Sequence, residues 1–223
     1  MSTPELLLQQ INGLVGDLVE MGLAQDQNYV FERRLSATKV EITFPQAEHL
    51  SAALKDQAYS EIYDALSSER ALVIKLPDGA LIQTQYLFEG EVLERHRLAF
   101  YPSPYLEEFQ NNPEIYLQDD IFADVVARSL VPFPLRFDFD CRPNVWRPLH
   151  HPQSHLSLGQ YENCRIPVSA PVSPACFIDF ILRNFYNTAF NQYADKLHSS
   201  SWCFGNSIQD VEQRVVHIRI PTI

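Results

Sequence analysis

The sequence predicts an α+β fold in which an antiparallel sheet of about six to eight strands is packed on one side by two helices. One helix is N-terminal and the other is a long helix in the C-terminal half. Apolar residues recur every three or four positions in both of these regions, as on the buried face of a helix. Between them lie strand-like runs separated by short turns, and later segments in which apolar and polar residues alternate. Helices and strands therefore come in groups, which is typical of an α+β fold.

The N-terminal helix is predicted by its start signal and its apolar stripe. Ser2-Thr3-Pro4-Glu5 combines a hydroxyl cap, a proline at the first helical position and an early acid. Gly22 is a plausible stop. The stripe that must dock on the rest of the protein consists of Leu7, Ile11, Leu14, Leu18 and Met21.

Residues 39–101 predict a short strand, a second helix and a meander. The strand covers 39–44 and ends at Pro45, and the helix runs over 46–67 with an apolar face every fourth residue. Turn sequences separate the three strands of the meander. These strands are expected at 71–76, 81–88 and 91–101, and the helical face comprises Leu50, Leu54, Ala58, Ile62 and Leu66.

The C-terminal half predicts the remaining elements. Ser173-Pro174 repeats the cap-plus-proline signal and precedes a long helix over 175–194 that is apolar enough to be largely buried. The alternation in 214–220 predicts a half-buried closing strand. Shorter elements are expected as helices at 105–110 and 120–129, and as strands at 135–140, 154–158 and 164–168.

Composition excludes several classes of protein. The length fits a single domain over 1–223, and 7 Gly argue against a Gly-rich nucleotide-binding loop. A net charge of −11 opposes non-specific binding to nucleic acid. The start of the chain lacks a secretory signal and no window is long enough to cross a bilayer, so we expect a cytoplasmic protein without a membrane partner. The four cysteines form no C-x-x-C pair, which predicts free thiols.

The stretch 134–159 concentrates the polar residues that carry chemistry. In the strand 135–140, alternation places Leu135, Phe137 and Phe139 on one face and Arg136, Asp138 and Asp140 on the other. The strand 154–158 alternates as well, with His155 and Ser157 on its polar face. If these two strands pair, His155 faces the aspartates.

Two kinds of chemistry fit these residues. Asp138, Asp140, His151 and His155 offer the oxygen and imidazole donors that suit Mg²⁺, Mn²⁺ or Zn²⁺, and such a divalent ion would activate water for hydrolysis. Without a metal, His155 would act as base or acid, Asp138 would orient it and Arg136 would hold an anionic group such as phosphate. Neither set of residues has a spacing that is diagnostic of a known site.

A purely structural interpretation explains the same residues. A strand reading L-R-F-D-F-D can have one core face and one solvated face that carries an internal Arg–Asp pair. Histidines in the loop around His150-His151-Pro152 are then surface residues, and His155 is a core histidine bonded to a carbonyl.

Four segments resemble a bacterial family known as domain of unknown function 2290. They are R-F-D-F-D at 136–140, H-P-x-S-H-L-x-L-G at 151–159, C-R-I-P-V at 164–168 and F-I-D-F-I-L-R-N-F-Y at 177–186. The resemblance covers most of the chain and brings no activity with it. The order of the motifs is also loosely similar to that in toxin-type proteins of toxin–antitoxin and phage-defence loci, which implies RNA or nucleotide chemistry.

These observations leave two functional hypotheses. In the first, the chain is a hydrolase or nuclease-like enzyme in which Asp138, Asp140 and His155 serve as metal or acid–base residues and Arg136 binds an anion. In the second, it is a non-catalytic subunit that binds a protein partner in a bacterial defence or toxin–antitoxin complex. Convergence of Asp138 and His155 in a cleft, with side chains within about 3 Å directly or through an ion or water, favours the first hypothesis. A dominant exposed apolar patch favours the second.

Overall fold

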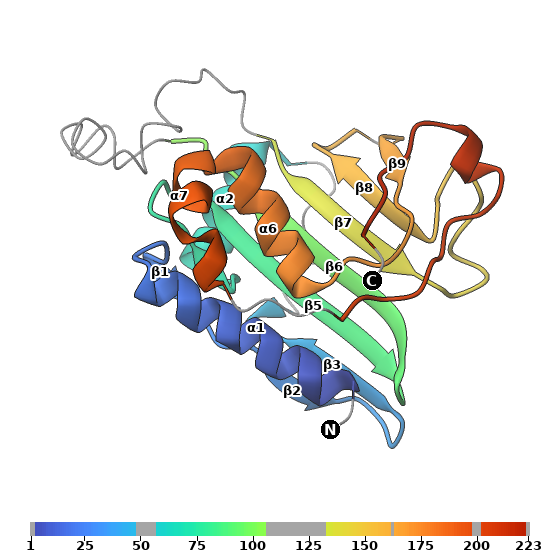
Figure 1. Cartoon of the computed structure of the whole chain (residues 1–223), viewed down its shortest axis with the longest axis horizontal. Helices are drawn as coiled ribbons and strands as arrows, with labels where there is room; N and C mark the ends of the chain where they lie inside the picture. Colours follow the sequence, from blue (N-terminus) through green and yellow to red (C-terminus); the bar gives the residue numbers. More distant parts are fainter. Residues whose placement is uncertain (1–2, 48–56, 106–132, 162, 198–201, 222–223) are drawn as a thin grey trace.

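The computed structural model describes residues 3–47, 57–105, 133–161, 163–197 and 202–221, and it confirms the α+β fold (Figure 1). One antiparallel sheet of nine strands runs in the order β1-β4-β5-β6-β7-β8-β9, while β3 pairs with β5 and β2 pairs with β3. The strands are β1 (Asp26–Gln27), β2 (Phe31–Arg34), β3 (Lys39–Thr43), β4 (Ile74–Lys75), β5 (Leu81–Glu89), β6 (Val92–Tyr101), β7 (Leu135–Asp140), β8 (Ser154–Leu158) and β9 (Arg165–Pro167).

Helices α1 (Thr3–Glu20) and α6 (Pro174–Phe185) cover one face of the sheet (Figure 1). The predicted stripe of α1 is buried except for Met21, which is half-buried, and Gly22 ends the helix at a φ of 71°. Ser173 caps α6 by accepting a hydrogen bond from the Cys176 amide, as the Ser-Pro signal predicts. The first helix begins at Thr3, one residue before the proline that was expected at its first position.

Aromatic side chains join α6 to the apolar face of the sheet. Phe137 of β7 makes edge-to-face contacts with Phe177 and Phe180, and Phe100 of β6 stacks on Phe185. Such ring pairs add about 0.5–1.5 kcal/mol each to the gain from burying their apolar area. The apolar half of the alternation in β7 is therefore the surface on which α6 docks.

The second helix is shorter in its described part than the periodicity predicts. Within the described residues it is α2 (Tyr59–Ser68), and Ala58 is an extended N-cap residue rather than part of the helix. Ile62 and Leu66 are buried as expected. Residues 48–56, including Leu50 and Leu54, lie outside the described part, as do most of the predicted helix at 105–110 and all of the predicted helix at 120–129.

The predicted long helix over 175–194 is wrong because the chain leaves the helical conformation at Tyr186, where φ is −133° and ψ is 55°. After this break, α7 (Asn187–Tyr193) and the short 3₁₀ turn η2 (Ala194–Lys196) follow. The hydroxyl of Tyr186 donates to Oδ2 of Asp78 at 2.6 Å, in the turn before β5. This tertiary contact fixes Tyr186, and helical periodicity in the sequence carries no sign of it.

The predicted closing strand over 214–220 is also wrong. The 3₁₀ turn η3 (Glu212–Arg214) occupies its beginning, and Val216 is 87% exposed. Among the described residues, the segment meets the sheet through a single parallel bridge between Ile218 and Val168. The predicted strand 71–76 is reduced to the two residues of β4, and the sequence did not predict β1 or β2.

No helix in the described part of the chain combines the length and apolar character needed to span a bilayer. The longest described helix, α1, docks instead on the sheet and on α6.

We expect Tyr186→Phe to lower the free energy of unfolding by about 1–3 kcal/mol, because a half-buried carboxylate loses a hydrogen-bond donor. Burial raises the pKa of Asp78 and the Tyr186 hydroxyl opposes this rise, so the variant should destabilise more at pH 8 than at pH 4. Urea denaturation at both pH values measures the effect. Tyr161→Phe is the control, since Tyr161 is 78% exposed, and equal losses in both variants would contradict the prediction.

Candidate functional site

The register of β6, β7 and β8 brings polar side chains from three strands into one row. Asp138 of β7 pairs with Arg97 on one side and with His155 on the other. The pairing of 135–140 with 154–158 that the sequence predicted is thus confirmed, and His155 does lie opposite Asp138. We use the term polar row for Arg97, Arg136, Asp138 and His155, which lie on the face of the sheet opposite α6.

Two arginines bind the carboxylate of Asp138. Nε of Arg136 lies 2.5 Å from Oδ2, and Nε of Arg97 lies 3.3 Å from Oδ1. Burial by itself raises the pKa of Asp138, but attraction by Arg136 and Arg97 outweighs it and holds the pKa below its ordinary value. The side chain of Asp138 therefore stays ionised near neutral pH, and both of its oxygens are occupied.

His155 is held by its own loop rather than by Asp138. Its Nδ1 lies 2.9 Å from the carbonyl oxygen of Pro152, so the neutral ring carries its proton on Nδ1. Its Nε2 lies 3.9 Å from Oδ2 of Asp138, which is too long for a hydrogen bond. Burial lowers the pKa of His155 to about 4, although Asp138 opposes this shift. At neutral pH the lone pair of Nε2 thus faces a carboxylate oxygen.

Two acceptors that face one another without a proton between them form an incomplete arrangement. A water that donates one proton to each of these atoms would complete the pair, and the side chains of His155 and Asp138 are 4% and 16% exposed. The proton donor that completes the pair is the kind of group from which a histidine base removes a proton.

The other residues predicted from the sequence lie at different distances from the polar row. The ring of His151 lies 4.9 Å from that of His155, with Nδ1 bonded to the carbonyl of Val145. Asp140 shares the polar face of β7 but is bonded by Arg142 through both of its oxygens. The structure therefore brings Arg136, Asp138, His151 and His155 together and gives Asp140 a separate partner.

The polar row offers few free ligands for a metal ion. Within residues that the structure describes, no three His, Cys, Asp or Glu side chains are grouped so as to hold a metal ion. Both oxygens of Asp138 already accept from guanidinium groups, whose positive charge disfavours a nearby cation.

Arg97 is the member of the polar row that the sequence analysis missed. The alternation in β6 puts Arg95 and Arg97 on one face, but only the pairing of β6 with β7 shows that this face carries Asp138. His96 projects to the opposite, apolar face, where its Nε2 accepts from the Val172 amide at 3.0 Å. Burial lowers the pKa of His96 to about 3.

Further polar contacts extend this face across β5 and β3. Gln85 donates to Oε1 of Glu41, while Arg33 binds Oε2 of the same carboxylate. Glu41 is buried, which is rare for an acid unless it is paired. The polar face thus carries a second group of hydrogen-bonded side chains, around Glu41, beside the polar row.

Comparison with known proteins places the chain in a family. The family model described as "Uncharacterized conserved protein (DUF2290)" matches residues 23–220. The chain belongs to this family. The match includes all of β1 to β9 and the whole polar row, so the site lies within the part that defines the DUF2290 family. No curated protein and no solved structure matches the chain.

We expect the free energy of unfolding to rise with pH between about 4 and 6.5. The folded-state pKa values of His155 and His96 are lowered to about 4 and about 3, so in this window the unfolded chain binds protons that the folded chain does not. His155 alone accounts for about 3 kcal/mol of this change.

Denaturant unfolding over a series of pH values tests this expectation. His155→Gln should reduce the pH dependence by about half, because His96 still contributes. The exposed residue His150 provides the control variant His150→Gln, which should keep the full dependence. Unchanged stability of the wild-type protein from pH 6.5 to 4 would show that these histidines become protonated without cost.

Proposed function

We propose that this DUF2290 protein is a metal-independent hydrolase of a small phosphate-bearing substrate, with the polar row as its active site. Arg97 and Arg136 bind the anionic group, and Nε2 of His155 accepts the proton of the attacking water or hydroxyl. The observation that carries the proposal is the neutral imidazole lone pair that faces an arginine-bound carboxylate across a 3.9 Å gap.

The charges of the polar row favour an anionic ligand. Two guanidinium groups and one carboxylate leave a net charge of +1 when His155 is neutral. Each arginine binds Asp138 through Nε, and its terminal nitrogens make no hydrogen bond to another described residue. The side chains of Arg97 and Arg136 are 44% and 41% exposed, so their planar donor groups are accessible for phosphate.

The role of Asp138 differs from the one inferred from the sequence. Asp138 was expected to orient His155, but the backbone carbonyl of Pro152 does so. Asp138 instead holds Arg97 and Arg136 next to one another. Its Oδ2 is one of the two acceptors that face each other across 3.9 Å. In the proposed mechanism it is a positioning residue, and His155 is the catalytic base.

The substrate class follows from charge and from the similarity of motif order. The proposal keeps the nucleotide or RNA substrate implied by the likeness to toxin-type proteins. The net charge of −11 opposes long-range attraction of a polynucleotide, which favours a nucleotide or a short RNA over a long duplex. A role in a defence or toxin–antitoxin locus is part of the same proposal and rests on that likeness alone.

Hydrolysis assays in EDTA test the proposal directly. We expect turnover of p-nitrophenyl phosphate, bis(p-nitrophenyl) phosphate or a fluorogenic oligoribonucleotide, and a loss of about 10²–10⁴-fold in kcat in His155→Gln. The value of kcat/KM should rise with pH through about 4, because His155 acts only when neutral. Arg136→Gln should raise KM.

The matched control is His150→Gln, which changes an exposed loop histidine and should retain activity. Wild-type protein inactive on all three substrates, or a His155→Gln variant as active as the wild type, would refute a hydrolase at this site. Activity that is lost in EDTA and restored by Mn²⁺ would favour the metal form of the first hypothesis instead.

One observation favours the second hypothesis, a non-catalytic subunit. Among the strands that the structure describes, β2 pairs with β3 alone and is therefore an edge of the sheet, and exposed apolar side chains accompany it. An edge strand of this kind can pair with an extended segment of a partner protein. The exposed side chains beside and within β2 are Tyr29, Phe31 and Leu35.

We expect Phe31→Lys to weaken binding of a protein partner at least about tenfold while leaving the fold intact, because Phe31 is exposed on the edge strand. Affinity for the partner identified by crosslinking in the native host measures the effect. Val216→Lys changes an exposed residue of the C-terminal segment and serves as the control. Equal affinity of the two variants would exclude β2 as the interface.

A further inference from the structure

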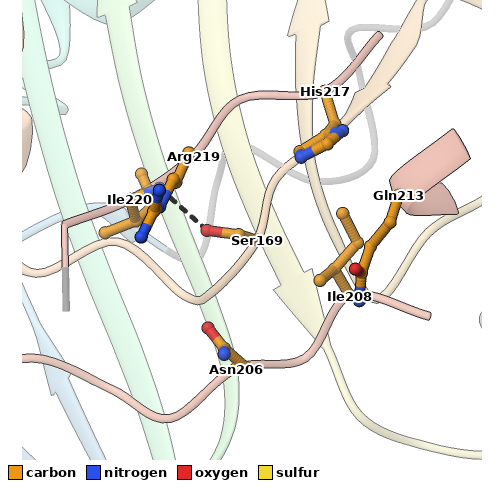
Figure 2. Close-up of a pocket in the computed structure, with 7 residues that line it drawn as sticks. All are labelled: Ser169, Asn206, Ile208, Gln213, His217, Arg219 and Ile220. Carbon is orange, nitrogen blue, oxygen red and sulfur yellow. Dashed lines mark hydrogen bonds between the residues drawn. The ribbon is translucent and has the colours of Figure 1, made fainter. Parts of the chain in front are cut away.

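The C-terminal segment, residues 214–220, forms one wall of a pocket whose lining includes no residue of the polar row. The pocket has a volume of about 280 Å³, and Figure 2 shows its residues arranged around Ser169. His217, Arg219 and Ile220 come from the C-terminal segment, while the residues opposite come from the loop over 206–213. Those opposite residues are Asn206, Ile208 and Gln213.

Ser169 fixes both walls of this pocket. Its carbonyl accepts hydrogen bonds from the amides of Ser207 and Ile208 on one side. Its amide donates to the carbonyl of Ile218, and its hydroxyl accepts from the amide of Ile220 at 2.8 Å, on the other side. The walls are therefore held in place by hydrogen bonds before any ligand arrives, which reduces the entropy cost of binding.

The lining of the pocket combines polar side chains with one arginine and two isoleucines. Among the described residues, no carboxylate lines the pocket and Arg219 forms no ion pair. Nδ1 of His217 lies 3.0 Å from the carbonyl of Val215, which leaves Nε2 for a ligand. The amides of Asn206 and Gln213 supply further donors and acceptors.

Glu212, the buried acid next to Gln213 in the chain, has hydrogen-bond partners outside the pocket lining. Glu212 is buried, and its two oxygens accept hydrogen bonds from the amides of Gln209 and Leu149. These bonds shape the loop that leads to Gln213 and keep the carboxylate of Glu212 out of the lining. In a protein whose net charge is −11, Arg219 gives this pocket a local positive charge.

We propose that this pocket binds a small anionic metabolite through a phosphate or carboxylate group. Arg219 forms paired hydrogen bonds to two oxygens of the anion, and Asn206, Gln213 and Nε2 of His217 bind its other polar groups. Ile208 and Ile220 contribute apolar contacts. The size of the pocket suits a metabolite, not a polymer.

This inference is independent of the proposed hydrolase. The pocket shares no residue with the polar row. An anion bound there bridges the C-terminal segment and the loop over 206–213, so it stabilises the attachment of both to Ser169. Because Ser169 lies two residues after Pro167, which pairs with His155, variants at Arg219 and at Arg136 are compared so that each site is tested separately.

Titration with inorganic phosphate and with malonate, followed by amide NMR shifts at constant ionic strength, tests the inference. We expect saturable shifts at residues 206–220 and Ser169 that are separate from any shifts at the polar row, and at least tenfold weaker binding at the pocket in Arg219→Gln. Arg214→Gln is the matched control, because Arg214 is exposed on the same segment and does not line the pocket. Arg136→Gln separates this site from the polar row and should leave these shifts unchanged.

The outcomes separate the ligand classes. Saturation by phosphate alone assigns a phosphorylated metabolite, and saturation by malonate alone assigns a carboxylate. The inference is overturned if neither anion gives saturable shifts in this region, or if Arg219→Gln binds as tightly as Arg214→Gln. Backbone amide spectra of each free variant verify that the fold is retained.

Discussion

The row formed by Arg97, Asp138 and His155 across three strands is the constraint on which the polar face depends. Strand register sets this row, because a slip of one residue in β7 would turn Arg136 and Asp138 toward α6 and Phe137 toward Arg97. The apolar contacts of Phe137 with α6 and the ion pairs of Asp138 therefore stabilise the same register from opposite faces.

The energetics of the row explain why it contains two arginines. Burying a carboxylate costs several kcal/mol in lost hydration. Attraction to one exposed cation would offset only part of this cost. Arg136 and Arg97 together hold the pKa of Asp138 below its ordinary value. The same burial lowers the pKa of His155, so one environment keeps an acid charged and an imidazole neutral.

Residues 167–173 contact the polar row, the pocket and the apolar face of the sheet. Pro167 pairs with His155 in the sheet, and Ser169 holds both walls of the pocket. Val172 donates its amide to His96 and accepts from the hydroxyl of Tyr86, and Ser173 caps α6. A displacement of this short segment would therefore disturb the polar row, the pocket and the core together.

The sequence by itself determined the elements whose signals are local. The caps of α6, the apolar stripe of α1 and the alternation in β7 could be read directly, because each follows from residue type and spacing. Tertiary structure decided which neighbours those elements meet. It broke the long helix at Tyr186, placed Arg97 on Asp138 and formed the pocket around Ser169. These features arise from contacts between residues far apart in the chain, and no local pattern encodes such contacts.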